Sequence, residues 1–167
     1  MLTYILKLIK VLNSEDDPAQ IAWAVCFAAL FGFTPTFSLH NLLVVFLVLI
    51  FRINITAFIL FSALFAGASY LLVPIFLLLG KSVLEMQSLG GIWTALYNTS
   101  IGRLSHFNNT LVMGGIVSAL LIWVPLYFAT RSGIVNFRVK ALPWIEKAHV
   151  VRVLKASRVY RLYADLG

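Results

Sequence analysis

Four apolar blocks fill most of residues 18–130, and their unequal lengths constrain the fold more than any other feature of the sequence. The first two blocks, 18–33 and 36–51, have 16 residues each, whereas 53–79 has 27 and 110–130 has 21. An α-helix rises about 1.5 Å per residue, so only the last two blocks comfortably cross a hydrocarbon layer of about 30 Å. The sequence therefore predicts two long transmembrane helices and two short helices that are marginal as spans.

Composition supports an all-α integral membrane protein. Hydrophobic residues make up 61% of the 167 residues and charged residues 11%, with a mean hydropathy of +0.95. Soluble domains average about 45–50% apolar and about 25% charged residues. The length allows one compact membrane domain and no separate soluble enzyme module. The single cysteine, Cys26, excludes an intrachain disulfide and a cysteine-based metal site, and we expect it to be a small buried hydrophobe.

The two short blocks meet at FGFTPTFSLHN, residues 31–41, where polar side chains interrupt the apolar run. Asp17 followed by Pro18 is a typical helix start, with the carboxylate as N-cap. The residue before Pro35 is disfavoured in the α region, so the first helix ends just before this proline. We therefore predict a short-helix hairpin pair over 18–51, either re-entrant or made of two short full spans.

The distribution of basic residues predicts the orientation. In both forms of the hairpin pair, the chain leaves on the side from which it entered. With a cytoplasmic N-terminus, 11 of the 13 lysines and arginines lie in the cytoplasm, and only Lys81 and Arg103 lie outside. This is the positive-inside pattern, so both termini are predicted to be cytoplasmic. The membrane domain then covers 1–133, and a basic cytoplasmic tail covers 134–167.

Three segments outside the apolar blocks carry their own patterns. The start MLTYILKLIKVLN lacks a cleavage site and suits an interfacial N-terminal helix. Apolar residues at steps of three to four predict a helix on the outer surface over 82–107, and Asn109 or Thr110 can cap the last span. Residues 135–140 alternate with period two, which fits a half-buried strand or an extended linker.

Four basic residues recur at every third position near the C-terminus. They favour a helix lying on anionic cytoplasmic headgroups over a voltage sensor, because no membrane acid is there to pair with them. Nucleic-acid binding is not expected. The four residues are Arg152, Lys155, Arg158 and Arg161.

The first and third apolar blocks show a weak internal sequence repeat. FAALF at 27–31 is followed by GFTP, and FSALF at 61–65 is followed by AGAS. Paired interrupted segments are typical of repeats built from broken helices, although chance matches are common in so apolar a chain. Whether 53–79 is one helix or a second broken one therefore stays open.

Polar groups at the break are the candidate functional residues, because unsatisfied backbone groups cost several kcal/mol in hydrocarbon. If 37–41 is helical, His40 and Asn41 lie on one side and can donate to a lipid headgroup, with the N–H groups of a helix start at 35–37 adding to the site. The alternative is a His40 side chain that is hydrogen-bonded within the fold, with Thr36 or Ser38 only capping a helix. The candidates for contact with a lipid headgroup or a partner are Thr34, Pro35, Thr36, Ser38, His40, Asn41, Arg52 and Asn54.

The role of Arg52 is open between an interfacial anchor and a phosphate ligand at the mouth of the hairpin. No catalytic residues are predicted: Ser38 and His40 are only two residues apart, GxSxG is absent, and the apolar blocks contain no carboxylate. No metal or cofactor site is expected.

The residues that carry a family resemblance lie in DDPAQIAWAVCFAALFGFTPTFSLHNLLVVFLVLIFRIN and VPIFLLLG, roughly residues 15–85. They include an entry proline, a G-x-x-P break and an Arg-x-Asn: Pro18, Gly32, Pro35, Arg52, Asn54, Pro74 and Gly80. The chain resembles a short branch of the bacterial membrane family called domain of unknown function 2062. That family is distantly similar to the DedA (VTT) superfamily of lipid transporters with facing re-entrant hairpins.

The resemblance implies lipid handling at the break and a larger protein partner. The chain lacks the membrane acids typical of DedA carriers, and AGAS replaces the Asn-Pro of many relatives, so autonomous proton-driven transport is not expected. The sequence thus predicts a small bacterial inner-membrane protein that aids transport or entry of a phospholipid or lipid carrier, as the membrane subunit of a larger lipid-transport complex. The alternative is a structural anchor or assembly subunit. A lipid-modifying enzyme would need a second catalytic group near His40.

Overall fold

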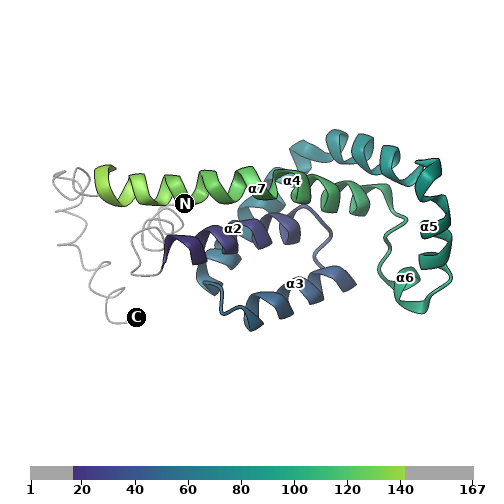
Figure 1. Ribbon diagram of the computed structural model, residues 1–167, viewed down its shortest axis with the longest axis horizontal. Coiled ribbons are helices and arrows are strands. Elements are labelled where there is room, and N and C mark those ends of the chain that lie inside the picture. The colour runs from purple at the N-terminus through teal and green to yellow at the C-terminus, as the bar shows by residue number, and fades with distance from the viewer. Residues whose placement is uncertain (1–16, 142–167) are drawn as a thin grey trace. The chain divides into compact units, whose positions relative to one another are not determined.

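The computed structural model describes residues 17–141, and all its regular elements in that range are helical (Figure 1). The prediction that the chain is helical is confirmed for this range. Two of the helices are long and apolar enough to cross a membrane. Residues 17–131 belong to one compact unit, and 132–141 belong to a second. The elements are α2 (Pro18–Gly32), α3 (Leu39–Ile50), α4 (Ile55–Leu84), η1 (Gln87–Leu89), α5 (Gly90–Tyr97), α6 (Ser100–Leu104), α7 (Thr110–Asn136) and the π-helix η2 (Phe137–Ala141).

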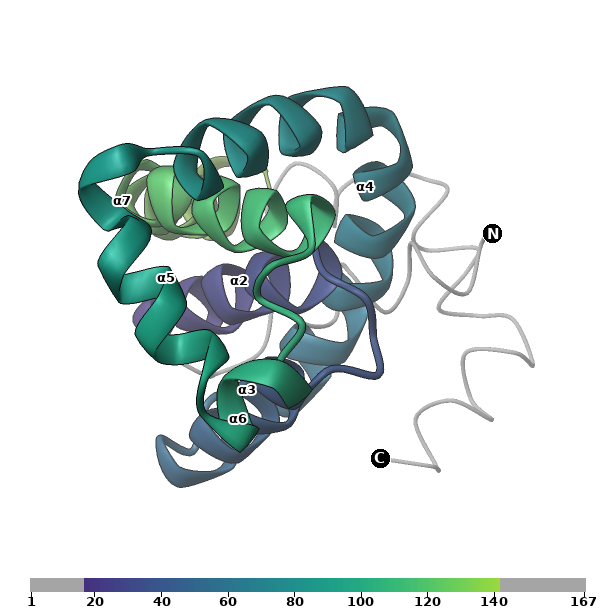
Figure 2. The same cartoon turned by 90° about the vertical axis from the view of Figure 1, so that its right-hand side faces the viewer.

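Helix α2 is the core of the larger unit. It lies between α7 and α3 and packs along α4 (Figures 1 and 2). The predicted start is confirmed, since the Asp17 carboxylate accepts from the backbone N–H of Ala19 at 2.9 Å and Pro18 is the first helical residue. A helix that is hydrophobic nearly all round is either buried in protein or in contact with lipid, and α2 is mostly buried in protein. Its buried residues are Ile21, Ala22, Ala24, Val25, Cys26, Phe27, Ala28, Ala29 and Gly32.

Aromatic rings join α2 to α7. The rings of Phe27 and Trp123 meet edge to face with their centroids 5.0 Å apart. The ring centroids of Trp23 and Tyr127 are 5.1 Å apart. The Cys26 thiol also links the two helices, since it donates to the backbone oxygen of Trp123 at 3.5 Å. Cys26 is buried, as predicted.

The third apolar block forms one helix, α4, which is bent near its middle (Figure 2). Pro74 lies inside the helix and has no N–H to donate, and the Ser69 hydroxyl donates to the backbone oxygen of Ala66 at 2.7 Å. Both features bend helices without ending them. The second copy of the apparent repeat is therefore followed by a bend, whereas the first is followed by a break.

The prediction of a single continuous helix over 82–107 is wrong. The first residues of that range complete α4, and η1, α5 and α6 follow as separate short elements. Thr99 separates the last two, because its side chain accepts from the backbone N–H of Gly102 at 2.9 Å and starts a new helix. The Trp93 indole donates to the backbone oxygen of Val83 at 3.2 Å and ties α5 to the end of α4.

Helix α7 begins as predicted and ends later than predicted. Asn109 caps it, since its side-chain oxygen accepts from the backbone N–H of Leu111 at 2.9 Å. The strand or extended linker predicted over 135–140 is wrong: α7 continues to Asn136, and the π-helix follows. Among residues 17–141 there is no strand for this segment to pair with, and extending an existing helix costs little.

Glycines bring α4 and α7 into backbone contact. A Cβ on Gly114 would collide with the backbone oxygen of Phe76 and lie 2.8 Å from its Cα. A Cβ on Gly80 would collide with the backbone oxygen of Thr110 and lie 2.8 Å from the nitrogen of Gly114. Small residues at a crossing allow the close packing that holds helices together in the absence of water.

Candidate functional site in the loop between α2 and α3

The Asn41 side chain closes the loop that joins α2 to α3. Its amide nitrogen donates toward three backbone oxygens: Pro35 at 2.9 Å, Phe31 at 3.3 Å and Thr36 at 3.4 Å. These carbonyls lie at the end of α2 and in the loop, where no helical N–H reaches them. The Asn41 side chain therefore supplies the hydrogen bonds that water would otherwise donate to these backbone oxygens.

Thr34 completes the same cluster. Its hydroxyl lies 3.1 Å from the Asn41 side-chain oxygen, 3.1 Å from the backbone oxygen of Leu30 and 3.3 Å from that of Phe31. Thr34 and Asn41 are only 6% and 1% exposed. Both side chains are therefore hydrogen-bonded within the fold.

The predicted helix start at 35–37 is wrong. Helix α3 begins at Leu39, and Ser38 is its N-cap with an extended backbone. The backbone oxygens of Pro35 and Thr36 accept hydrogen bonds from the Asn41 side chain and not from backbone N–H groups of a helix. This segment therefore lies outside α3. The N–H groups at 35–37 therefore do not form a helical anion site.

Ser38 and His40 form a pair that the spacing argument missed. The Ser38 hydroxyl lies 3.0 Å from Nε2 of His40 and makes no capping hydrogen bond. The extended backbone at Ser38 turns its side chain over the first turn of α3, which allows contact between residues two apart. His40 Nδ1 is shielded and has no hydrogen-bond partner among the described residues. A serine immediately before an apolar helix, followed two residues later by histidine, is the signal that could have indicated this pair.

The side chains at the loop tip are open to their surroundings. Pro35, Thr36 and Phe37 are exposed, whereas Ser38 and His40 are half-buried. These residues can meet a ligand or partner without breaking the hydrogen bonds that close the loop.

The remaining two candidates lie at the other end of α3, which extends roughly 15 Å beyond His40. Asn54 is the N-cap of α4, and its side-chain oxygen accepts from the backbone N–H of Ala57 at 2.7 Å. Arg52 is exposed and has a positive φ of 50°. The backbone N–H of Ile53 donates to the backbone oxygen of Val48 at 3.1 Å. This bond forms a Schellman motif at the C-terminus of α3, in which the position of Arg52 is usually occupied by glycine.

Replacing Arg52 with glycine is expected to stabilise the isolated fold by about 1 kcal/mol, because glycine adopts a positive φ without a Cβ clash. Denaturant titration in detergent micelles measures the change. If the guanidinium contacts lipid phosphate, the same variant loses lipid-dependent function despite its higher stability. Arg52→Lys, which keeps the charge and the strain, is the control. A variant with higher stability and full function would contradict a phosphate role for Arg52.

The candidate residues therefore form two groups, one at the loop and one at the opposite end of α3. The four basic residues predicted to lie on the membrane surface, Arg152, Lys155, Arg158 and Arg161, fall outside the described residues. Within residues 17–141, no group of three or more His, Cys, Asp or Glu side chains could hold a metal ion.

Comparisons with known proteins identify the family. Residues 3–142 match a family described as an uncharacterized protein conserved in bacteria (DUF2062). A protein of Treponema pallidum (strain Nichols), described as an uncharacterized protein, is 26% identical over 150 residues, covering 90% of this chain and 93% of that protein. No solved structure matches the chain. Since the family match extends from the first residues to the end of the described helices, the chain belongs to the DUF2062 family of bacterial proteins.

Proposed function

We propose that the chain is a multi-pass protein of the bacterial inner membrane with both termini in the cytoplasm. In this arrangement α4 and α7 cross the bilayer, and α2 and α3 form a re-entrant hairpin. Helix α2 has 15 residues and α3 has 12, which correspond to about 22 and 18 Å, well short of the hydrocarbon thickness of about 30 Å. The predicted excess of basic residues on one side supports the orientation.

The main support for a role in lipid transport is the exposed apolar face of α3. Only Asn41, Val44 and Val48 of this helix are buried. Lipid beside α3 would meet an apolar surface only about 18 Å long, and a bilayer adapts to a short apolar element by thinning. The exposed apolar residues are Leu39, Leu42, Leu43, Val45, Phe46, Leu49, Ile50 and Phe51.

A thinned bilayer shortens the path that a polar headgroup must travel through hydrocarbon. Thr36, Ser38 and His40 lie at one end of α3, and Arg52 lies at the other, so each end offers polar groups to a passing headgroup. Helices α2, α3 and α4 contain no aspartate or glutamate, which favours facilitated movement over proton-driven pumping. The chain would therefore aid transport or entry of a phospholipid or lipid carrier, as the membrane subunit of a larger lipid-transport complex. The resemblance of the sequence pattern to the DedA superfamily also supports a role in lipid transport.

The experiment is a lipid-flux assay. The protein, alone and with any partner that copurifies in mild detergent, is reconstituted into phosphatidylethanolamine and phosphatidylglycerol vesicles that contain a fluorescent phospholipid. An impermeant quencher then reports movement between leaflets. We expect faster movement than in empty vesicles. No acceleration under either condition would contradict the proposal.

Removing the exposed polar groups of the loop tests its part in this flux. The double variant Thr36→Val, His40→Leu is expected to lower the flux severalfold, because it removes headgroup contacts and leaves the hydrogen bonds of Asn41 intact. The melting temperature should change little, and the same flux assay provides the measurement. Thr94→Val, at an exposed threonine on α5, is the control. Full flux in the double variant would exclude these side chains as lipid contacts.

The second candidate function is a structural anchor or assembly subunit. The exposed apolar face of α3 and the fully exposed Phe37 ring would suit a partner helix equally well. Leu43→Cys introduces an exposed thiol on α3, whereas Cys26 is buried. Cross-linking from this thiol in native membranes separates the two functions: protein adducts favour the anchor, and lipid adducts favour lipid handling.

A further inference from the structure

Helix α6 lies beside the start of α3, next to the polar loop. Figure 1 shows α6 just beyond the first turn of α3, and Figure 2, turned by 90°, shows α6 in front of the same turn. His40 belongs to this first turn, and Ser38 is the N-cap that precedes it. Two segments that are far apart in the chain therefore face each other at this end of α3.

Local contacts hold α6 in its place. The Thr99 hydroxyl donates to the backbone oxygen of Leu96 at 2.7 Å and accepts from the backbone N–H of Gly102 at 2.9 Å. A Cβ on Gly102 would collide with the backbone oxygen of Leu96, so α5 and α6 are in backbone contact. The ring centroids of Trp93 and Phe107 are 5.8 Å apart, which joins α5 to the segment after α6. Helix α6 is thus held by α5 from both of its ends.

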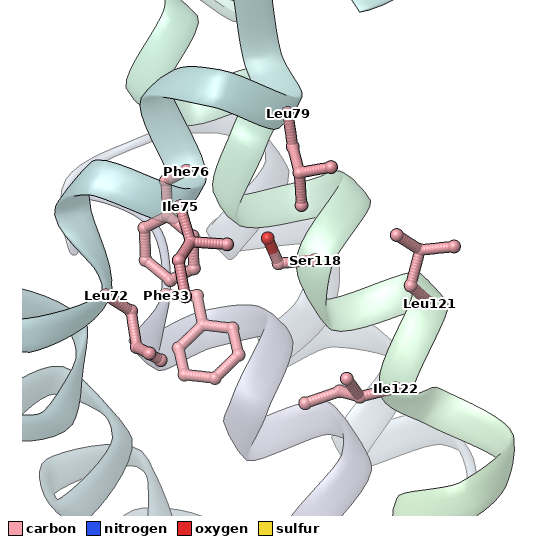
Figure 3. A pocket seen from close by; sticks show the side chains of 8 residues that line it. All are labelled: Phe33, Leu72, Ile75, Phe76, Leu79, Ser118, Leu121 and Ile122. Carbon is pink, nitrogen blue, oxygen red and sulfur yellow. The ribbon is translucent and has the colours of Figure 1, made fainter. Parts of the chain in front are cut away.

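The loop opposite α6 is anchored at Phe33. The Phe33 ring lies 5.1 Å from the ring of Phe76 on α4, and Figure 3 shows both rings among the side chains between α4 and α7. A Cβ on Gly115 of α7 would collide with the backbone oxygen of Phe33. Since Asn41 closes the rest of the loop, the side chains at its open end are presented from a fixed backbone.

Arg103, in α6, carries a positive charge that nothing in 17–141 neutralises. Its side chain is exposed and forms no ion pair with any residue in that range. The other basic side chain near this end of the unit, Lys81, lies 3.9 Å from the Glu85 carboxylate. The remaining acid in the range, Asp17, caps α2 at the end of that helix far from the loop. Arg103 is therefore available to an anion.

The Ser38–His40 pair supplies a hydroxyl donor on the α3 side. Ser38 Oγ and His40 Nε2 are 3.0 Å apart, and Nδ1 of His40 is shielded without a partner among the described residues. Shielded N–H groups without an acceptor are rarer than shielded acceptors without a donor, which favours the proton on Nε2, where it is donated to Ser38. The Ser38 hydroxyl then keeps its own proton for a further acceptor.

A phosphate group matches this combination of a guanidinium and a hydroxyl. The planar fork of arginine fits two oxygens of one phosphate, and hydrogen bonds to an ionised acceptor are about twice as strong as those between neutral groups. Lipid beside the exposed apolar face of α3 has its outer phosphate near the start of α3, because that face begins there. The phosphate of such a lipid therefore lies at the level of α6.

We propose that Arg103 and the Ser38 hydroxyl bind the phosphate group of an outer-leaflet lipid, with His40 as a positioning residue that orients the hydroxyl. This inference rests on the membrane placement and the lipid transport proposed above, and it names the headgroup chemistry that they leave open. The start of α3 forms one wall of the site, and α6 forms the other.

Photolabelling from the headgroup tests the site. The full chain is reconstituted in phosphatidylethanolamine and phosphatidylglycerol vesicles with a trace of phosphatidylglycerol that carries a diazirine on its headgroup, and adducts are located by mass spectrometry. We expect adducts at both 36–40 and 100–106. Arg103→Gln should reduce both severalfold, whereas Lys81→Gln should leave both unchanged, because the charge of Lys81 is already paired. Adducts near Arg52, at the other end of α3, are the internal reference.

Three substitutions separate donation by Ser38 from support by His40. Ser38→Ala should reduce the labelling at 36–40 and 100–106 severalfold. His40→Gln can replace the Nε2–H donor by an amide N–H and should keep most of the labelling. His40→Leu offers no donor and should lose as much as Ser38→Ala. The melting temperature in micelles should change little in all three, since neither side chain bonds to the rest of the fold.

Inorganic phosphate in large excess over the labelled lipid distinguishes the two sources of a phosphate group. We expect no competition, because the lipid is concentrated at the site by its chains. Competition would assign the site to free phosphate and overturn the lipid assignment. Labelling at only one of the two segments, no response to Arg103→Gln, or an equal loss in Lys81→Gln would overturn the site itself.

The site and the flux can fail separately. Labelling that depends on Arg103, in a protein that moves no lipid, would keep the site and refute the transport function. Flux without labelling at 36–40 and 100–106 would refute the site and keep the transport function.

Discussion

Asn41→Leu is expected to destabilise the fold by about 3 kcal/mol or more, because it strips hydrogen bonds from a buried turn. The backbone oxygens of Phe31, Pro35 and Thr36 lose the amide that serves them, and the Thr34 hydroxyl loses one of its acceptors. Leucine has the same branched side-chain skeleton as asparagine but none of its hydrogen-bonding groups. Denaturant titration in detergent micelles measures the change.

Two companion variants separate hydrogen bonding from other effects. Asn41→Asp keeps the shape but replaces the donor by an acceptor facing backbone oxygens, so it should be at least as harmful. Asn108→Leu changes an exposed asparagine and should have little effect. A stable, normally folded Asn41→Leu protein would show that water or a ligand satisfies the loop and that Asn41 does not close it.

Gly114→Ala is expected to separate α4 from α7 and to prevent stable folding or cost about 3 kcal/mol or more, since the new Cβ would overlap backbone atoms that no rotamer change can move. The collision is with the backbone oxygen and Cα of Phe76. Expression of folded protein, followed by thermal unfolding in micelles, measures the loss.

The matched control is Gly67→Ala. This glycine also lies in a long helix, but a Cβ added to it meets nothing within 4 Å. Its replacement should be neutral or stabilise α4 by up to about 1 kcal/mol through helix propensity. Equal behaviour of the two variants would refute a backbone contact at Gly114.

The sequence predicted the helices well where local chemistry decides them. Asp17 and Pro18 start α2, Pro35 ends it, and Asn109 caps α7, because caps and prolines act on backbone groups within a few residues. It failed at 82–107 and 135–140. Apolar spacing alone could not locate the cap at Thr99, and a period of two over six residues is too short to distinguish a strand from the end of a long helix.

The sequence predicted where the candidate site lies but not how its side chains are hydrogen-bonded. The polar break at 31–41 was identifiable, since so many hydrogen-bonding groups in an apolar chain need partners. Which of them are already paired was not, because Asn41 bonds backbone oxygens both at the end of α2 and in the loop, and only the folded turn brings these together. The structure assigns Thr34 and Asn41 to the fold and leaves Thr36, Ser38 and His40 at or near the open end of the loop.

By itself, the sequence determined the helical class, the two helices long enough to span, the break between the short helices and the family. These follow from hydrophobic length and local backbone preferences, which depend little on the rest of the chain. Only the tertiary structure decided that α2 is enclosed, that Asn41 closes the loop, and that Gly80 and Gly114 bring the backbones of α4 and α7 into contact. Each of these depends on which surfaces meet in space, and residues far apart in the chain settle that together.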